Sequence, residues 1–527
     1  MIESIKLIRK SWLALLLALL LPGLVFSAPS TTALKEVHSN GSGGGSWSDP
    51  TTWHDGVVPG AEDRVVITTS DRVVYDGGAT DNPDCAGLYI DPDGLLTFSL
   101  DGRHHQLTVA GPVETYGAIR ADATRDPNAR ATLLLASTND AERVLQIRRG
   151  GSLLFYGSAD ALAEPNLALC SPTNLPSGLI EGQGDIMFDL HHARVDGLRI
   201  QLSDIDNTGY RPLQRLNIIG NLFTRGSSLA LSRCDTAVIK ENSFDATNIL
   251  GINPAVLLIQ CTLTACHNNR FTGYAIAIDA RNDVDAALQY NEIVAATTAG
   301  LVLRSANNAM IKGNRLRDCV TGLMADKSSG VVEGLYLERV TNGVLLSSST
   351  LQMTDVNWVD NPVDARRLEL RDSTSVLLNC NVSAADIILT GSNPPGNLWV
   401  QSMAYLVAHV TGKLPEKAVI QVATAKVSGG VPVGTADLNV RNAPARLSAQ
   451  GWTPMPRTLR PIILRSWHIS TDKKVHDAPF YDLEVLPLVD DVGKPPQALK
   501  RQVVEPRDSW FRAEPDAPVA TFEVNIP

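Results

Sequence analysis

The stretch Ile218-Ile219-Gly220-Asn221-Leu222-Phe223 decides the fold, because its pattern recurs along the middle of the chain. The pattern is an apolar residue, two spacers, an asparagine, one spacer and a second apolar residue. Clear copies occupy residues 239–244, 266–271, 288–293 and 311–316, and weaker ones follow at Leu335, Asn357 and Asn381. The anchor positions are 21, 27, 22, 23, 21, 22 and 24 residues apart. Such a period is typical of a solenoid, in which each repeat forms one coil.

Each period contains short strands rather than helices. Residues 228–232, 275–279, 300–304 and 343–347 are short, rich in β-forming residues and bounded by Gly, Asn, Asp or Ser. The pattern therefore predicts a β-solenoid. Asparagine suits the anchor because it tolerates the left-handed backbone of a tight turn, and because its amide can bond the asparagines one coil above and below.

On these residues the chain resembles the right-handed parallel β-helix proteins of the pectate-lyase type, whose turns carry a ladder of asparagines. The resemblance covers about residues 185–395. It implies an all-β fold with a right-handed parallel β-helix over residues 185–390. A fold of this kind hosts many activities, so the resemblance indicates architecture far better than function.

Upstream, residues 46–160 are expected to form an all-β cap domain. Trp47, Trp53, Gly56 and Asp63 precede the strand 65–67, and further strands broken by Gly and Asp turns follow. This order is similar to the eight-glycine extracellular domain, which caps a β-helix in some surface proteins. The two tryptophans could form a sugar platform, but we expect them to cover the open end of the solenoid, where exposed strand edges would otherwise pair.

Members of that family that cleave hyaluronan carry two histidines after a glycine of the β-helix. The best match in this chain is Gly-Tyr-Arg-Pro-Leu-Gln-Arg at residues 209–215, which has neither histidine. The resemblance therefore does not carry hyaluronan cleavage over to this chain.

The flanking segments indicate export and a third module. Residues 1–27 read as a signal peptide, because a basic stretch precedes an apolar run too short to span a bilayer and a small-residue cleavage site. A flexible leader at 28–45 follows. Residues 391–397 are an expected linker, and the strand-like runs of 398–527 suggest a small β-sandwich. We expect a secreted or periplasmic protein with no stable membrane insertion after signal cleavage.

The seven cysteines give no metal motif. Cys234 and Cys261 each lie eight residues before an anchor asparagine, so they should stack on adjacent coils, either as a disulfide or as two buried thiols. The histidine pairs His104-His105 and His191-His192 are expected to be structural or solvated, because strand neighbours point to opposite faces. The sequence identifies no cofactor and leaves calcium open.

Outward positions on the strand before each asparagine turn supply a candidate catalytic set. If Ile276 and Ile278 point inward together with the matching leucines of the next coils, then Asp279, Arg304 and Asp326 point outward on three successive coils. Two carboxylates about 10 Å apart are near the long end of the range for an inverting glycosidase, and an arginine between them could bind an acidic sugar. The alternative is a solvent-exposed salt-bridge ladder that stabilises the stack.

Composition excludes several classes of function. The 527 residues carry a net charge of −10, which becomes −12 when the signal, with three basic residues and one acidic residue, is removed. Such an acidic chain is a poor binder of nucleic acid by bulk electrostatics. Phosphate-binding loops, dinucleotide fingerprints and HExxH motifs are also missing from the sequence.

Two classes of function remain for an exported protein of this architecture. The first is a polysaccharide-active enzyme, either a glycoside hydrolase, a polysaccharide lyase or an epimerase, that uses the outer strand face. The second is a non-catalytic glycan-binding, adhesion or envelope and exopolysaccharide assembly protein. In both, the expected partner is a polysaccharide or other glycan, and the oligomeric state is left open.

Overall fold

A computed structural model describes residues 34–527 apart from several short segments. The segments left out are 78–83, 137–142, 161–164, 173–177, 206–215, 248–253, 284, 392–398, 416–417, 429–430, 436–444, 449, 451–452, 454–461, 470–473, 478–480, 488–499, 505–520 and 527. The predicted signal peptide, most of the expected linker and the 209–215 segment lie outside the described residues.

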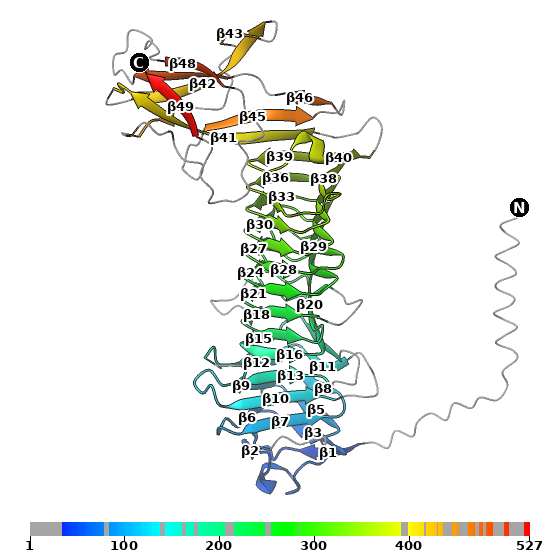
Figure 1. Ribbon diagram of the computed structural model, residues 1–527. Coiled ribbons are helices and arrows are strands. Elements are labelled where there is room, and N and C mark those ends of the chain that lie inside the picture. Colours follow the sequence, from blue (N-terminus) through cyan, green and yellow to red (C-terminus); the bar gives the residue numbers. More distant parts are fainter. Residues whose placement is uncertain are drawn as a thin grey trace, which may run out of the picture.

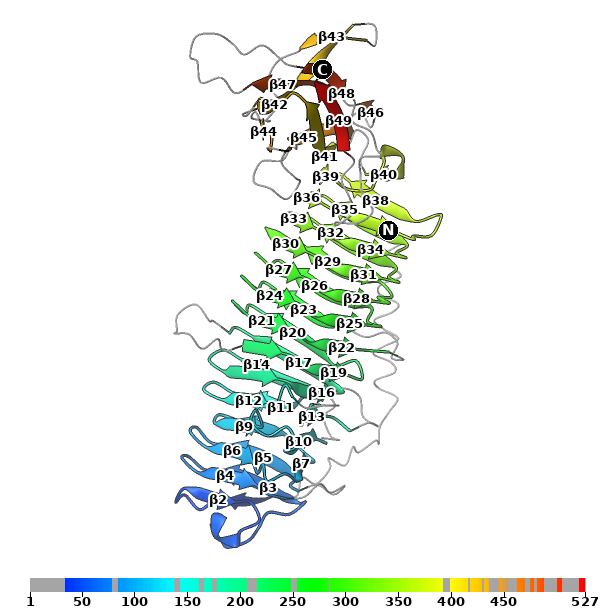
Figure 2. The ribbon, with the colours of Figure 1, turned by 60° about the vertical axis from the view of Figure 1, so that its left-hand side comes forward.

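The coils stack into an elongated solenoid, and their strands form three parallel β-sheets along its length (Figures 1 and 2). Sheet A has 15 strands: β1 (Lys35–His38), β3 (Asp63–Ile67), β5 (Gly87–Ile90), β8 (Val113–Thr115), β11 (Arg143–Ile147), β14 (Gly178–Gln183), β17 (Leu198–Ser203), β20 (Ser228–Ser232), β23 (Val256–Ile259), β26 (Ile276–Arg281), β29 (Ala299–Arg304), β32 (Thr321–Asp326), β35 (Asn342–Ser347), β38 (Arg366–Arg371) and β40 (Ile387–Thr390).

Sheet B follows sheet A within each coil. Its strands are β2 (Gly44–Ser46), β4 (Arg72–Tyr75), β6 (Leu95–Phe98), β9 (Ala118–Asp122), β12 (Ser152–Tyr156), β15 (Met187–His191), β18 (Leu216–Ile219), β21 (Val238–Lys240), β24 (Ala265–His267), β27 (Ala287–Gln289), β30 (Ala309–Lys312), β33 (Ser329–Glu333), β36 (Thr350–Thr354) and β39 (Thr374–Leu378).

Sheet C has 11 strands and closes the coils between β7 and β37. They are β7 (His104–Val109), β10 (Arg130–Leu135), β13 (Leu167–Cys170), β16 (Ala193–Asp196), β19 (Leu222–Thr224), β22 (Ser243–Asp245), β25 (Arg270–Thr272), β28 (Glu292–Val294), β31 (Arg315–Arg317), β34 (Tyr336–Glu338) and β37 (Asn357–Val359). The described residues contain no α-helix, and their only helical turns are the 3-10 segments η1 (Pro50–Thr52) and η2 (Ala384–Asp386). The predicted all-β parallel solenoid is confirmed.

The solenoid is continuous from its first coil to its last. Strand β11 pairs with β14, β10 with β13 and β12 with β15, so the ladders run without interruption past residues 160–185. One cluster of buried apolar side chains extends from Val37 to Val382 and beyond. The all-β unit expected at 46–160 and the β-helix expected at 185–390 therefore share the same sheets and the same core.

A buried asparagine ladder links five coils at the corner between sheets B and C. The side-chain amide of each asparagine donates to the carboxamide oxygen of the next one at 2.9–3.0 Å, and all five side chains are at most 2% exposed. The members are Asn221, Asn242, Asn269, Asn291 and Asn314. Each of the last four also accepts a hydrogen bond from the backbone N–H of the asparagine one coil before it, so these buried polar groups are paired.

One detail of the turn differs from expectation. The residue with left-handed backbone is the one before each asparagine, as at Glu241 (φ 60°) and Asn268 (φ 55°), and not the asparagine itself. The asparagine is selected for its two-sided amide, whereas the preceding position makes the turn. That position is therefore free to vary, and it holds Gly220 and Tyr290 in other coils.

The inside of the stack is filled by residues that repeat from coil to coil. Phe223, Phe244 and Phe271 stack with ring centroids 4.2 and 4.9 Å apart. At the N-terminal end, Trp47 and Trp53 pack edge to face at 5.1 Å and are 4% and 2% exposed. Both rings belong to the core that closes this end, and neither is an exposed platform for a sugar.

Cys234 and Cys261 lie in register, because the neighbouring residues Asp235 and Thr262 form a parallel bridge. Both are free thiols, as are the other five cysteines. Burial raises the pKa of Cys261 to about 12. The structure thus shows the stack of two buried thiols rather than the disulfide.

The C-terminal part continues sheet B through one strand. Strand β41 (Trp399–Gly412) pairs in parallel with β39 and antiparallel with β45 (Ile462–Ile469). The remaining strands are β42 (Ala418–Ser428), β43 (Val431–Thr435), β44 (Ala445–Arg446), β46 (Val475–Asp477), β47 (Tyr481–Pro487), β48 (Lys500–Val504) and β49 (Thr521–Ile526). Side chains of β41, β45 and β49 share a second apolar core with β42 and β47, which agrees with the expected sandwich (Figure 1).

None of the helical turns in the described part of the chain is long and apolar enough to cross a membrane.

The ladder predicts a large stability loss on removal of one rung. Asn269→Ala would remove the acceptor of the backbone N–H and of one side-chain N–H of Asn242, together with the side-chain donor to the carbonyl of Ile239 and to the oxygen of Asn291. We expect the free energy of unfolding to fall by about 2–4 kcal/mol, measured by urea denaturation. The exposed Gln352→Ala on sheet B is the control, and equal effects of the two changes would contradict this role of the ladder.

Candidate functional site

The structure places the three sequence-predicted site residues on sheet A, but in a different register. Asp279 of β26 is aligned with Val302 and, one coil further, with Met324. Arg304 is aligned with Arg281 and with Asp326. The expected column of Asp279, Arg304 and Asp326 is therefore wrong by two residues at Asp279. Alternation fixes which face a side chain occupies, but a slip of two residues preserves every face, so the pattern cannot detect it.

Asp279 is closed off from solvent. Its side chain is 0% exposed on the outer face of sheet A, where Leu257 and Val302 flank it in register. One carboxylate oxygen accepts hydrogen bonds from Nη2 and Nε of Arg281 at 2.6 and 3.0 Å, and the other lies 3.6 Å from Nε of Arg304. Asp279 thus holds two guanidinium groups in place, and its carboxylate is not accessible to a ligand from solvent. Asp326, by contrast, is exposed.

Asp283 lies in the turn that follows β26, at the corner between sheets A and B of the same coil as Asp279. Its side chain is 1% exposed, and its Oδ1 accepts the backbone N–H of Cys261 at 2.7 Å, while Oδ2 has no partner among the described residues. In later coils the hydroxyls of Ser328 and Ser349 make the equivalent bond to the coil before. Burial raises the pKa of Asp283 to about 7, and the nearby charge of Asp279 adds to the effect.

Replacing Asp283 by the serine of the later coils should stabilise the protein at neutral pH. Since the pKa rises from 3.8 in the unfolded chain to about 7 in the folded one, folding favours the protonated acid. The associated stability is complete below pH 4 and is lost as the pH rises to about 7. Asp283→Ser should therefore raise the free energy of unfolding at pH 8 by up to about 4 kcal/mol, and by little at pH 4.

Thermal melts of both proteins at the two pH values measure this difference, with the exposed Asp326→Ser as control. A variant that melts below the wild type at pH 8 would show that the carboxylate stabilises the corner.

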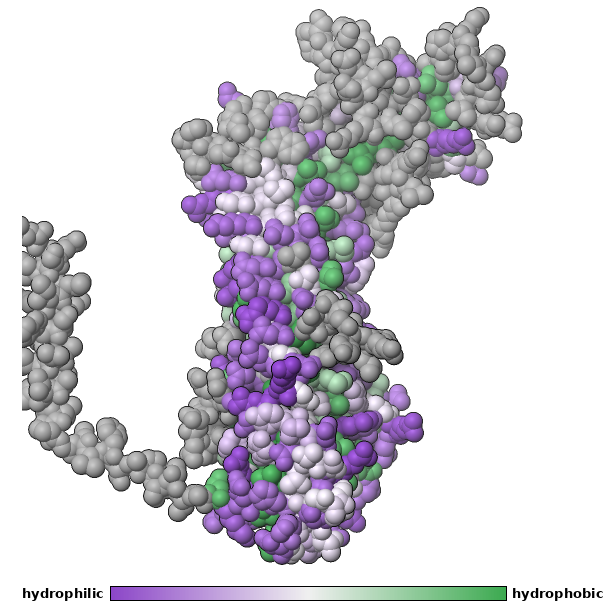
Figure 3. Space-filling view, turned by 180° about the vertical axis from the view of Figure 1, so that it is seen from behind, coloured by the Kyte–Doolittle hydropathy of each residue, from purple (hydrophilic) through white to green (hydrophobic). Residues whose placement is uncertain are grey.

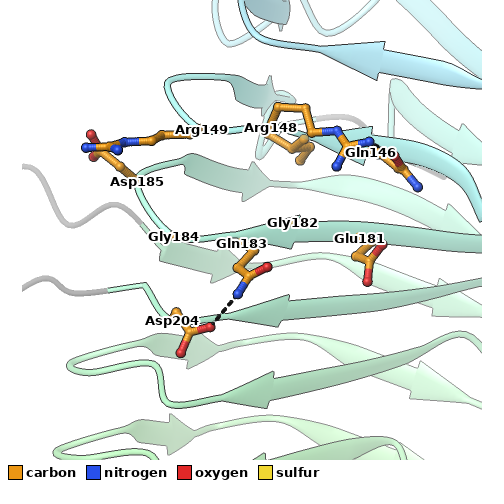
Figure 4. Close-up of a pocket in the computed structure, with 10 residues that line it drawn as sticks. Gln146, Arg148, Arg149, Glu181, Gly182, Gln183, Gly184, Asp185 and Asp204 are labelled. Atoms are coloured by element: carbon orange, nitrogen blue, oxygen red, sulfur yellow. Dashed lines mark hydrogen bonds between the residues drawn. The ribbon is translucent and has the colours of Figure 1, made fainter.

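A polar hollow lies on sheet A several coils before Asp279. It has a volume of about 700 Å³ and is lined by strands β11 and β14 and by the turns that follow β11, β14 and β17 (Figure 4). Its lining residues are Gln146, Ile147, Arg148, Arg149, Glu181, Gly182, Gln183, Gly184, Asp185 and Asp204. Side chains from three successive coils thus combine arginine and amide donors with carboxylate acceptors around one space.

The polar groups of the hollow are held by hydrogen bonds to one another and to charged residues beside it. Gln183 donates to Oδ2 of Asp204 at 2.8 Å (Figure 4). Arg233 donates to the same oxygen at 2.9 Å. Hydrogen bonding from Arg233, supported by Gln183, lowers the pKa of Asp204 to about 2. On the other side, Nε of Arg148 bonds Glu114 at 2.7 Å. Asp204 is therefore ionised at physiological pH and can act as a hydrogen-bond acceptor, but it cannot donate a proton as a general acid.

The sequence reasoning missed the hollow. Its residues precede the clear asparagine repeats, so no period singled them out. A usable signal is the polar outward set of three neighbouring strands, namely Gln146 and Arg148, Glu181 and Gln183, and Gln201 and Ser203, which alternate with buried residues.

The histidine pairs behave differently from one another. His105 is buried and its Nε2 lies 2.7 Å from Asp101, whereas His104 is exposed. His191 points outward from sheet B and its Nε2 lies 2.7 Å from Oδ1 of Asp189. His192 sits in the next turn with left-handed backbone (φ 48°). Among the described residues no group of three His, Cys, Asp or Glu side chains could hold a metal ion.

Comparison with known proteins gives one match. Residues 203–401 match the family described as "Periplasmic copper-binding protein (NosD)", which covers well under half of the chain. No curated protein and no solved structure matches the chain. The match lies within the parallel β-solenoid, and the periplasmic description agrees with the predicted export.

The residues of the matched region do not fit a copper site. His267 is its only histidine, and all five of its cysteines are at most 2% exposed. Burial raises the pKa of Cys266 to about 12, which disfavours the thiolate that a metal requires. The likeness to this family is therefore one of architecture in the solenoid, and no chemistry is assigned to copper.

Proposed function

We propose that this protein is an exported glycan-binding solenoid and that the polar hollow on sheet A holds the glycan. The observation that carries the proposal is the lining of the hollow, in which donors and acceptors from three coils surround an open space of about 700 Å³. Sugars present many hydroxyl groups that both donate and accept, and such groups match a surface of arginines, amides and carboxylates.

The chemistry of the hollow argues against other partners. Glu181, Asp185 and Asp204 would repel the phosphates of a nucleic acid, in keeping with the net charge of −10. Ile147 is the one large apolar residue of the lining, so a lipid or a hydrophobic peptide would gain little binding free energy from burying its apolar surface there. The surface opposite to the view of Figure 1 is also largely hydrophilic over the described part of the solenoid, with small hydrophobic patches (Figure 3).

Binding is tested with a panel of dextran, polygalacturonate, alginate and heparin, followed by isothermal titration calorimetry. Combined Arg149→Ala and Gln183→Ala substitutions should weaken binding of the glycan that the wild type takes by at least about tenfold, since two or more hydrogen bonds are lost. Arg371→Ala is the matched control, because Arg371 is exposed at an outward position of sheet A many coils away. Binding that survives the double substitution would exclude the hollow.

Catalysis is tested separately on the same panel. We expect the wild type to release neither reducing ends nor unsaturated products, because the Asp279 carboxylate is buried under its own ion pairs. Turnover that disappears in Asp279→Asn with Asp326→Asn would instead show that these two carboxylates are required for catalysis. Turnover that survives both changes would place the reaction elsewhere.

A further inference from the structure

A cluster of titratable side chains lies on the outer face of sheet B, around the corner from the hollow. The hydroxyl of Tyr156 donates to Oδ2 of Asp189 at 2.8 Å, and Nε2 of His191 lies 2.7 Å from Oδ1 of the same carboxylate. The rings of Tyr156 and His191 meet edge to face with centroids 5.3 Å apart. Three residues of β12 and β15 are thus locked together outside the core.

Asp189 is the centre of this cluster but is not itself available to a ligand. Its side chain is 12% exposed, and both of its oxygens accept a hydrogen bond. A carboxylate oxygen accepts, so Nε2 of His191 is the donor of this bond, and Nδ1 on the other side of the ring is left to form a hydrogen bond with a ligand. Nδ1 has no partner among the described residues, and the His191 side chain is 30% exposed.

The neighbours in register extend the cluster into a polar surface. Asp122 is aligned with Tyr156 on one side, and Asn217 is aligned with Asp189 on the other. Arg120 forms a 3.0 Å ion pair with Asp122. Half-buried aromatic rings bordered by amide and charged groups offer both an apolar surface and hydrogen-bonding groups, which is the combination that a sugar ring requires.

The cluster and the hollow belong to the same coils. Strand β14 supplies Glu181 and Gln183 to the hollow, its following turn supplies Asp185, and the next strand, β15, carries Asp189 and His191. Four residue steps lead from Asp185 to Asp189, so the two residues lie at most about 13 Å apart. A polymer that leaves the hollow along the strand direction therefore comes next to Tyr156 and His191.

We propose that Tyr156 and His191, oriented by Asp189, form a second glycan subsite on sheet B, continuous with the hollow around the corner of the coil. This inference rests on the proposed function and specifies the course of the ligand, which runs around a coil rather than along the solenoid axis. The role of Asp189 is positional, since it fixes the His191 ring so that Nδ1 can form a hydrogen bond with a sugar hydroxyl, which both donates and accepts.

The test uses the full mature chain and the polysaccharide of the panel that binds most tightly. His191→Ala should raise the Kd about tenfold and Tyr156→Phe about threefold, as expected for loss of a ring contact with a hydrogen bond and for loss of orientation alone. His267→Ala is the matched control, because His267 lies at an outward position of the same sheet on β24 and belongs neither to the lining of the hollow nor to the cluster around Asp189. Its Kd should stay within a factor of two of the wild type.

A second readout reports contact directly. Carbethoxylation of histidines by diethyl pyrocarbonate, mapped by mass spectrometry, should be slowed at His191 and unchanged at His267 when the polysaccharide is present. Equal affinity of His191→Ala and the wild type, or an unprotected His191, would overturn the second subsite while leaving the hollow intact. If the wild type binds no member of the panel, both this inference and the proposed function fall.

Discussion

The stacking of coils at the spacing of neighbouring parallel strands is the constraint on which the rest of this structure depends. Each inward side chain meets the equivalent side chain of the next coil about 4.8 Å away, so a residue is acceptable only if it packs against its own kind or bonds to it. Asn242 satisfies this rule by bonding Asn221 and Asn269, and Phe244 satisfies it by stacking on Phe223 and Phe271. A buried amide without such a neighbour would be costly, which is why these groups occur as ladders.

The same constraint leaves the outer faces free to vary. Because the core is closed inside the coils, outward residues of sheets A and B are chosen by what they do at the surface. Charges that are nevertheless buried there are paired, as Asp279 is with Arg281 and Asp189 is with Tyr156 and His191. These pairs hold arginine and imidazole groups at defined positions, so the rigid scaffold presents organised polar groups rather than mobile ones.

The asparagine repeat predicted much of the fold, and particular residues show which features it could not predict. The anchor asparagines located the turns, and alternation correctly assigned Asp279, Arg304 and Asp326 to the outer face of sheet A. The register of Asp279 was missed because the slip of two residues keeps the same alternation. The first coils, from β1 to β17, carry no anchor asparagine, so their membership in the same solenoid became visible only from their strand pairing.

The sequence by itself determined the period, the strands and the apolar side of each strand, because all three are local properties of spacing and side-chain type. Only the tertiary structure decided which outward residues come together. Gln183 and Asp204 lie 21 residues apart, and Tyr156 and Asp189 lie 33 residues apart, yet each pair shares a hydrogen bond. Such contacts depend on the exact length of every turn between the coils, and that length is set by the packing of the whole stack rather than by the residues that meet.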